Sequence, residues 1–429
     1  MSNTAAHKLL ATLTLAAATL TAMAQDNAYD NFDRYRIGGY GEMVAAFKGY
    51  GINRFSGSTE GNDYMRRNTI SIPRFVLAGD YRMARRWVLG AEIEFESGGT
   101  GIAYEIENTE NGEWETDVEK GGEVAIEQFH ITYLGARWLN VRVGHMVLPV
   151  GLTNAHHEPV NFFGTVRPES ETAILPSTWH ETGLSVFGRV GGQRSYVSYE
   201  AYVTAGLNAN GMSRNKWANG ASQGLFEQDN FTSPAYTLRL DYNMPGLRIG
   251  ASAYYCADIG ANSDKPNMYA QYGSIPLYVL TADAQWRHRY FTARANIIYG
   301  QMDKSDRVNA RNNRLGKSPY STQVPIAHTT LSYGAEAGLN LRRIVRADMP
   351  DITPFCRYEH YDPQRSVEGS YTPDPRLKTD MWTAGINWRA LPTLVVKADY
   401  TTRRIGSGRY HRENELAVGV AFTDWFAKR

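Results

Sequence analysis

Segments of about ten residues in which apolar and polar side chains alternate recur over residues 35–426. In one of them, Leu394 and Val396 alternate with Lys397 and Asp399. A period of two places successive side chains on opposite faces of a β-strand, whereas an amphipathic helix repeats every 3.6 residues. We find no convincing helical repeat in this range. The pattern therefore predicts an all-β chain in which each strand has one apolar face.

The links between these segments discriminate between two all-β architectures. Alternation alone also fits a water-soluble sandwich, in which the apolar faces pair into a core. Short links lie at residues 83–85, 135–137, 191–193, 243–246, 287–289 and 390–392. Long links lie at residues 49–68, 97–123, 150–180, 208–234, 257–275, 301–329, 362–378 and 404–413. Because the two kinds take turns, an antiparallel meander collects all short turns at one end. We predict a transmembrane antiparallel β-barrel of about sixteen strands, with short periplasmic turns and long extracellular loops.

Composition and aromatic placement agree with a barrel in a membrane. After residue 24, no apolar run approaches the roughly 20 residues that a membrane-spanning helix needs. The chain has 27 Tyr and 9 Trp, many of them at the ends of the alternating segments. Aromatic girdles at both headgroup layers have this distribution. A soluble propeller, the second fold considered, requires a blade-length repeat that we do not find.

The first 24 residues read as a secretory signal peptide. Lys8 supplies the positive charge, residues 9–20 the apolar stretch, and Ala22-Met23-Ala24 the small-residue cleavage site. We therefore predict export to the outer membrane of a Gram-negative cell and one barrel domain over residues 25–429. Lys8 is one of 45 basic residues, so the remainder balances the 44 acidic residues. This balance gives no reason to expect a nucleic-acid partner.

A family resemblance is carried by three stretches: residues 143–152 (VGHMVLPVGL), 158–163 (EPVNFF) and 179–184 (WHETGL). In these the chain resembles the phosphate-selective porin O and P family, most closely its bacteroidete-type members. The resemblance implies a homotrimeric, sixteen-stranded channel in contact with outer-membrane lipid and lipopolysaccharide. It also implies that the third long link, residues 150–180, folds inward as a constriction loop. The solutes would be small hydrophilic molecules or inorganic ions, including anions such as phosphate. The chain departs from the usual porin terminus, because Phe426 is followed by three further residues.

The polar face of each strand supplies the candidate lining of the pore. The candidate basic lining residues are Arg74, Arg142, Arg239, Arg294, Arg357 and Lys397. The candidate acidic lining residues are Glu42, Asp80, Glu92, Glu94, Glu96, Glu200, Asp241, Asp283, Glu336, Glu359 and Asp399. The candidate residues of the constriction loop are Glu158, Arg167, Glu169 and Glu171. We expect these loop carboxylates to face the pore with only Arg167 beside them. Because the two signs nearly balance, we expect weak ion selectivity without tight phosphate binding.

Catalytic and metal chemistry are not expected. His156, His157, Glu158, His180 and Glu181 offer metal-ligand types, but they form no H-E-x-x-H pairing. We predict no metal and no cofactor. A Ser–His–acid site assembled on the barrel needs no local motif, but no G-x-S-x-G elbow is present and we predict a protein that is not an enzyme. The alternative function is an adhesin or surface-binding scaffold whose pore is plugged by loops.

Overall fold

The computed structural model describes residues 32–51, 66–99, 102–108, 114–120, 122–218, 222–223, 229–263, 266–314, 324–346, 348–407 and 411–429. The predicted signal peptide lies outside the described residues. The strands that close the barrel are β1 (Tyr35–Lys48), β2 (Arg67–Ala84), β3 (Trp87–Glu96), β6 (Glu123–Ala136), β7 (Leu139–Val147), β8 (His180–Gly191), β9 (Tyr196–Thr204), β10 (Ala235–Met244), β11 (Leu247–Cys256), β12 (Leu277–Arg287), β13 (Phe291–Met302), β14 (Thr329–Leu339), β15 (Asp351–Ser366), β16 (Thr379–Leu391), β17 (Leu394–Ile405) and β18 (Arg412–Lys428).

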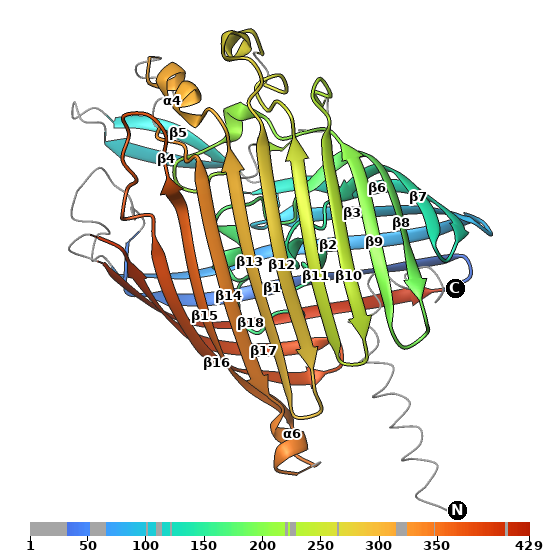
Figure 1. Cartoon of the computed structure of the whole chain (residues 1–429). Helices are drawn as coiled ribbons and strands as arrows, with labels where there is room; N and C mark the ends of the chain where they lie inside the picture. Colours follow the sequence, from blue (N-terminus) through green and yellow to red (C-terminus); the bar gives the residue numbers. More distant parts are fainter. Residues whose placement is uncertain are drawn as a thin grey trace, which may run out of the picture.

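These sixteen strands form one closed antiparallel barrel within the described residues (Figure 1). Each strand pairs with the barrel strands before and after it in the chain, so that β3 pairs with β6, and β1 pairs with β18 to close the sheet. The strand count and the closed antiparallel topology predicted from the sequence are confirmed. Strands β4 (Ile102–Asn108) and β5 (Trp114–Lys120) form a separate hairpin between β3 and β6. The sequence pattern indicated only a long link there, residues 97–123.

Short turns and long loops lie at opposite ends, as predicted (Figure 1). The short helices in the loops are α2 (Leu152–Ala155), α3 (Glu169–Thr172), η1 (Ala209–Gly211), η3 (Pro266–Met268), η4 (Ala270–Tyr272), α4 (Ser305–Asn313) and, in a turn at the other end, α6 (Leu341–Ile344). Residues 340–346 and 348–350 lie in a turn between β14 and β15 that was not among the short links expected from the sequence. A side-chain cap accounts for its helix, because the Asn340 side chain accepts a hydrogen bond from the Arg343 backbone N–H.

The burial of the strands is the reverse of that in a water-soluble protein. On β10, Leu238 and Leu240 are each 45% exposed, whereas Arg239 is 0% exposed and Asp241 4%. The apolar face therefore points outward and the polar face inward. A soluble sandwich would bury the apolar faces, so this arrangement excludes it. A closed barrel with an apolar exterior and a polar interior is the form in which strands cross a lipid bilayer.

Aromatic pairs lie across neighbouring strands on the outer surface. Trp87 and Tyr133 pair between β3 and β6, with ring centroids 4.9 Å apart. Tyr255 and Tyr278 stack between β11 and β12, at 5.1 Å. Such pairs stabilise the sheet and suit the headgroup layers of a membrane. In the described part of the chain, no helix is both long enough and apolar enough to cross a membrane.

The main hydrophobic cluster lies where long loops meet the strands β7 to β14. Its fully buried members include Met146, Leu148, Leu207, Trp179, Trp217, Tyr254, Ile275, Ile298 and Met302. The Trp217 indole N–H donates to the Ala327 carbonyl and so joins two long loops. The cluster therefore fixes the loops over one side of the barrel mouth.

Candidate functional site

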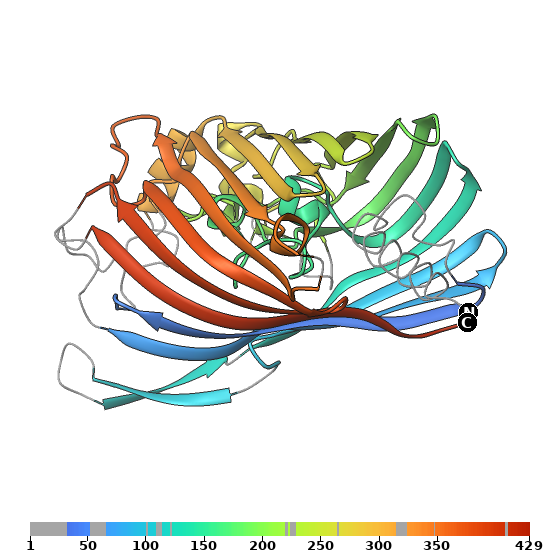
Figure 2. The same cartoon turned by 90° about the horizontal axis from the view of Figure 1, so that it is seen from below.

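The third long link, residues 150–180, runs inside the barrel (Figure 2). It begins just after β7, yet Lys397 on β17 donates from Nζ to three of its carbonyls. The acceptors are the carbonyl oxygens of Pro159 at 2.6 Å, Phe162 at 2.8 Å and Gly164 at 2.8 Å. Strands β7 and β17 are not neighbours in the barrel. The segment therefore crosses the interior, and we call it the inward loop.

Other wall cations bind the backbone of the inward loop in the same way. Arg74 on β2 donates to the His157 carbonyl at 2.6 Å. Arg294 on β13 donates to the Asn161 carbonyl at 2.9 Å. Irregular backbone inside the barrel has carbonyls to which no sheet partner donates, so donors from the wall satisfy them. Cations from several sides of the wall therefore fix the path of the loop.

Arg239 on β10 contacts both the inward loop and two carboxylates of the wall. Its guanidinium lies 3.5 Å from the carbonyls of Pro149 and Gly151. It also forms ion pairs with Asp241 at 2.7 Å and Asp283 at 3.0 Å. The side chain is 0% exposed, so both of its partners are needed to compensate the buried charge.

The carboxylates of the inward loop face wall arginines, which corrects the expectation that only Arg167 lies beside them. Glu171 pairs with Arg294 at 3.0 Å. Glu169 accepts from Arg403 on β17, with Nε at 2.7 Å. Arg167 instead donates to Ser177 and Thr178 on the same loop. The expectation was wrong because Arg294 and Arg403 are far from the loop in the sequence and come near it only when the barrel closes.

The remaining candidate residues of the loop and wall also have polar or aromatic partners. Glu158 accepts from the Asn161 side chain at 2.5 Å. Burial raises the pKa of the Glu171 carboxyl, and the nearby Arg294 partly offsets this effect. Arg142 on β7 lies over the Phe187 ring, 4.7 Å from its centroid, and its Nε donates to Thr132.

Carboxylates of the wall compensate the positive charges of Arg357 and Arg74. Arg357 pairs with Glu336 at 2.8 Å, and Glu336 also pairs with Arg294 at 2.8 Å. Arg74 pairs with Glu42 at 3.3 Å. The predicted basic lining residues thus face the interior, but several of them are bound to the loop or to acids.

Two charged residues of this site were absent from the predicted lining. Arg403 lies on the same face of β17 as Lys397, so the alternation in the sequence already indicated that its side chain faces the interior. Glu127 had no such signal, because it sits at a β-bulge: Glu92 pairs with Gln128 and Ile93 with Ile126, which leaves Glu127 between them. A bulge inserts one residue and re-aims its side chain. Glu127 is 0% exposed.

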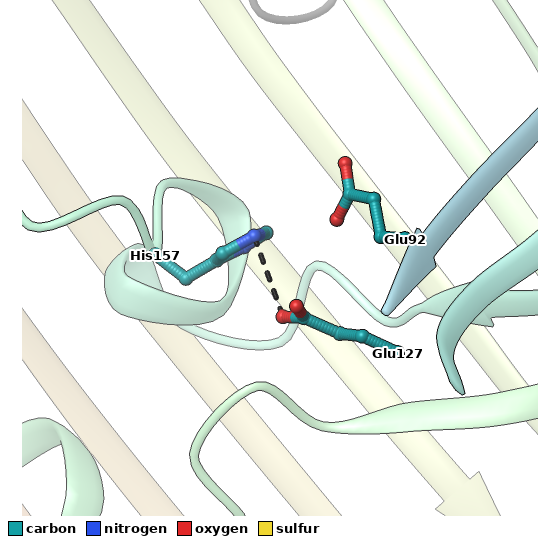
Figure 3. Close-up of side chains that lie close together, drawn as sticks. All are labelled: Glu92, Glu127 and His157. Atoms are coloured by element: carbon teal, nitrogen blue, oxygen red, sulfur yellow. Dashed lines mark ion pairs between the residues drawn. The ribbon is translucent and has the colours of Figure 1, made fainter. Parts of the chain in front are cut away.

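The metal-ligand types noted in the sequence do not form one cluster. His180 lies against His145, with 2.5 Å between their ring nitrogens. Glu181 accepts from the Trp179 indole at 3.1 Å. His157 instead points to the wall, where its Nε2 is 3.6 Å from Glu127 (Figure 3).

Two solved porins superpose on this barrel over most of its length. OmpF of Salmonella typhi, solved in complex with daunomycin, superposes with a TM-score of 0.56 at 11% identity, over 92% of this chain and 99% of the other. An anion-selective porin from Comamonas acidovorans superposes with a TM-score of 0.50 at 10% identity, over 91% and 99%. The chain has the porin fold. At these identities the likeness establishes the porin fold alone.

The chain also has a relative by sequence similarity. A protein of Aquifex aeolicus (strain VF5), described as uncharacterized, is 25% identical over 369 residues, which are 85% of this chain and 74% of the relative. No protein-family profile matches the chain.

Proposed function

We propose that this protein is an outer-membrane porin, a passive diffusion channel for small hydrophilic solutes and ions, without enzymatic activity. The observation that carries the proposal is a polar, charged interior crossed by a loop that wall cations hold, inside a barrel with an apolar exterior. A barrel wall that faces lipid outside and water inside suits an aqueous passage. The loop would set the width of that passage.

The cellular setting follows from the same proposal. The predicted signal peptide would direct the chain to the outer membrane, with the short turns in the periplasm and the long loops outside. The exposed apolar faces would contact lipid, lipopolysaccharide and neighbouring copies. The resemblance to the phosphate-selective porin family supports a homotrimer.

Selectivity in this channel would be weak. A site that dehydrates phosphate needs clustered cations whose charge is available to the anion. Here Arg239, Arg294 and Arg357 each pair with carboxylates. The low-dielectric walls still focus the field of each group, so the walls would orient passing solutes without holding them. Phosphate would pass as one small anion among others.

One observation favours a second function, an adhesin or surface-binding scaffold. The hydrophobic cluster that includes Trp179, Trp217 and Tyr254 fills space between long loops at the barrel mouth. If this packing closes the mouth completely, the loops would form a rigid external surface over a plugged barrel.

Planar-bilayer recording of the detergent-purified protein separates these two functions. A porin should give stepwise conductance, grouped in threes if the trimer inserts as one unit. A salt gradient should give small reversal potentials, and micromolar phosphate should leave the chloride current unblocked. Bilayers that stay sealed at high protein load would reject the channel and favour the scaffold. Block by micromolar phosphate would reject weak selectivity.

A further inference from the structure

The inward face of β1, β2 and β3 carries a compensated group of charges. Arg74 lies 3.3 Å from Glu42 and 3.9 Å from Glu94. All three side chains are buried. One guanidinium thus already faces two carboxylates on this wall.

Two more carboxylates lie beside this group, and each accepts a hydrogen bond from an uncharged donor. Glu92 accepts from the Gln128 amide at 2.8 Å. Glu127 accepts from the Tyr40 hydroxyl at 3.0 Å. Glu127 is fully buried, and a buried carboxylate needs a proton, a cationic partner or a metal ion. Glu127 is therefore a point on the wall at which a bound cation would be stabilised.

His157 from the inward loop completes a set of metal ligands there. Glu92, Glu127 and His157 each offer one ligand atom, and these atoms lie within 4.8 Å of one another. Figure 3 shows the three side chains converging from two strands and the loop. His157 is only 9% exposed, and its Nδ1 is buried without a hydrogen-bond partner. Its Nε2 lies 3.6 Å from Glu127, beyond a normal hydrogen bond.

We propose that Glu92, Glu127 and His157 bind a divalent transition-metal ion of the Zn²⁺ type. One imidazole with two carboxylates is a ligand set that Zn²⁺ accepts. Zn²⁺ bonds of about 2.0–2.2 Å at tetrahedral angles put two ligand atoms about 3.4 Å apart. The 3.6 Å between His157 and Glu127 fits this spacing. Glu92 is only partly buried, which leaves a route for the ion and for a water ligand.

The ion would fasten the inward loop to the acidic wall. Arg74 already holds the main-chain carbonyl of His157, and the ion would hold its side chain. Lys397 and Arg294 anchor other parts of the same loop. The absence of a metal predicted from the sequence rested on local motifs, whereas these ligands come from three separate segments.

The test uses the full chain in detergent after treatment with EDTA and removal of the chelator. Isothermal titration with Zn²⁺ should show one ion per chain with micromolar or tighter affinity. Co²⁺ should bind at the same site and give visible absorption bands. Glu127→Gln and His157→Asn should each weaken Zn²⁺ binding at least tenfold, and His157→Asn should also shift the Co²⁺ bands.

The matched controls are buried inward residues outside the cluster. Glu200→Gln on β9 and His130→Asn on β6 should bind Zn²⁺ within twofold of the unmodified protein. Should Glu127→Gln fail to fold, Glu92→Gln serves instead, because Glu92 is partly exposed. Absence of saturable binding, or unchanged binding in the cluster variants, would overturn the site. Ion binding is measured without current, so its outcome is independent of whether the barrel conducts.

Discussion

Lys397 shows how one side chain determines the position of the inward loop. Its ammonium has three donors, and three loop carbonyls accept them. It also lies 4.3 Å from the centroid of the Phe162 ring, within the range of a cation–π contact. The contacts just named compensate this buried cation with carbonyl dipoles and an aromatic ring.

Replacing Lys397 by Met should loosen the loop. The three carbonyls would lose their donor inside the barrel, and each unsatisfied buried acceptor costs about 1–3 kcal/mol. The temperature at which the barrel unfolds on a heat-modifiability gel should fall, and single-channel current should become noisier. Lys428→Met, which removes an exposed lysine at the end of β18, should change neither. Unaltered unfolding and current in Lys397→Met would show that the loop does not depend on this anchor.

At the scale of elements, ion pairs connect the inward loop to the barrel wall. Glu169 binds Arg403 and Glu171 binds Arg294. Arg403 has a second carboxylate, Glu415, at 3.2 Å. Removing the loop carboxylates therefore leaves the wall arginines with fewer partners but still held in place.

The double variant Glu169→Gln, Glu171→Gln should move permeation toward anions. Two negative charges leave the interior, and the low-dielectric walls amplify the change, so we expect the chloride-to-potassium permeability ratio to rise by about twofold or more. Reversal potentials in a KCl gradient measure this ratio. The control is Asp306→Asn with Asp348→Asn, which removes two carboxylates outside the barrel wall, in α4 and in the turn after α6. An equal shift in both variants would mean that the loop carboxylates do not border the passage.

At the scale of the whole molecule, the barrel is stable only in a solvent that accepts its apolar exterior. Leu238 lies in the middle of β10 on the outward face, and Met244 lies on the same face at the turn end. The two positions differ mainly in their expected depth in the bilayer. They therefore provide a matched pair for testing the lipid contact.

Leu238→Arg should destabilise the folded barrel in lipid vesicles by about 2–4 kcal/mol, because arginine on the lipid face is most costly near the bilayer midplane. Met244→Arg should cost about 0–1 kcal/mol near the interface. Urea unfolding in vesicles, followed by tryptophan fluorescence, measures both free energies. Equal costs at the two sites would show that β10 does not cross the bilayer in the proposed way.

The amino-acid sequence alone determines the strand count, the alternation of short and long links and the outward direction of the apolar faces. These features depend on a local period of two and on the length of each link, both of which are visible in one dimension. The same alternation placed Arg239, Arg294, Arg357 and Lys397 on the inward face. It also contained Arg403, on the same polar face of its strand as Lys397.

The partners of these charges arise only when the barrel closes. Glu171 meets Arg294 across 123 positions of sequence, and Lys397 reaches the inward loop across more than 230. No local pattern encodes such pairs, because they depend on which strands stand on opposite sides of the interior. Glu127 depends further on a one-residue bulge, because its inward direction is in phase with the outward Val124 and Ile126 before it but out of phase with the outward Phe129 after it. Local periodicity therefore determines which side chains face the interior of the barrel. Closure of the sheet determines which partners those side chains meet.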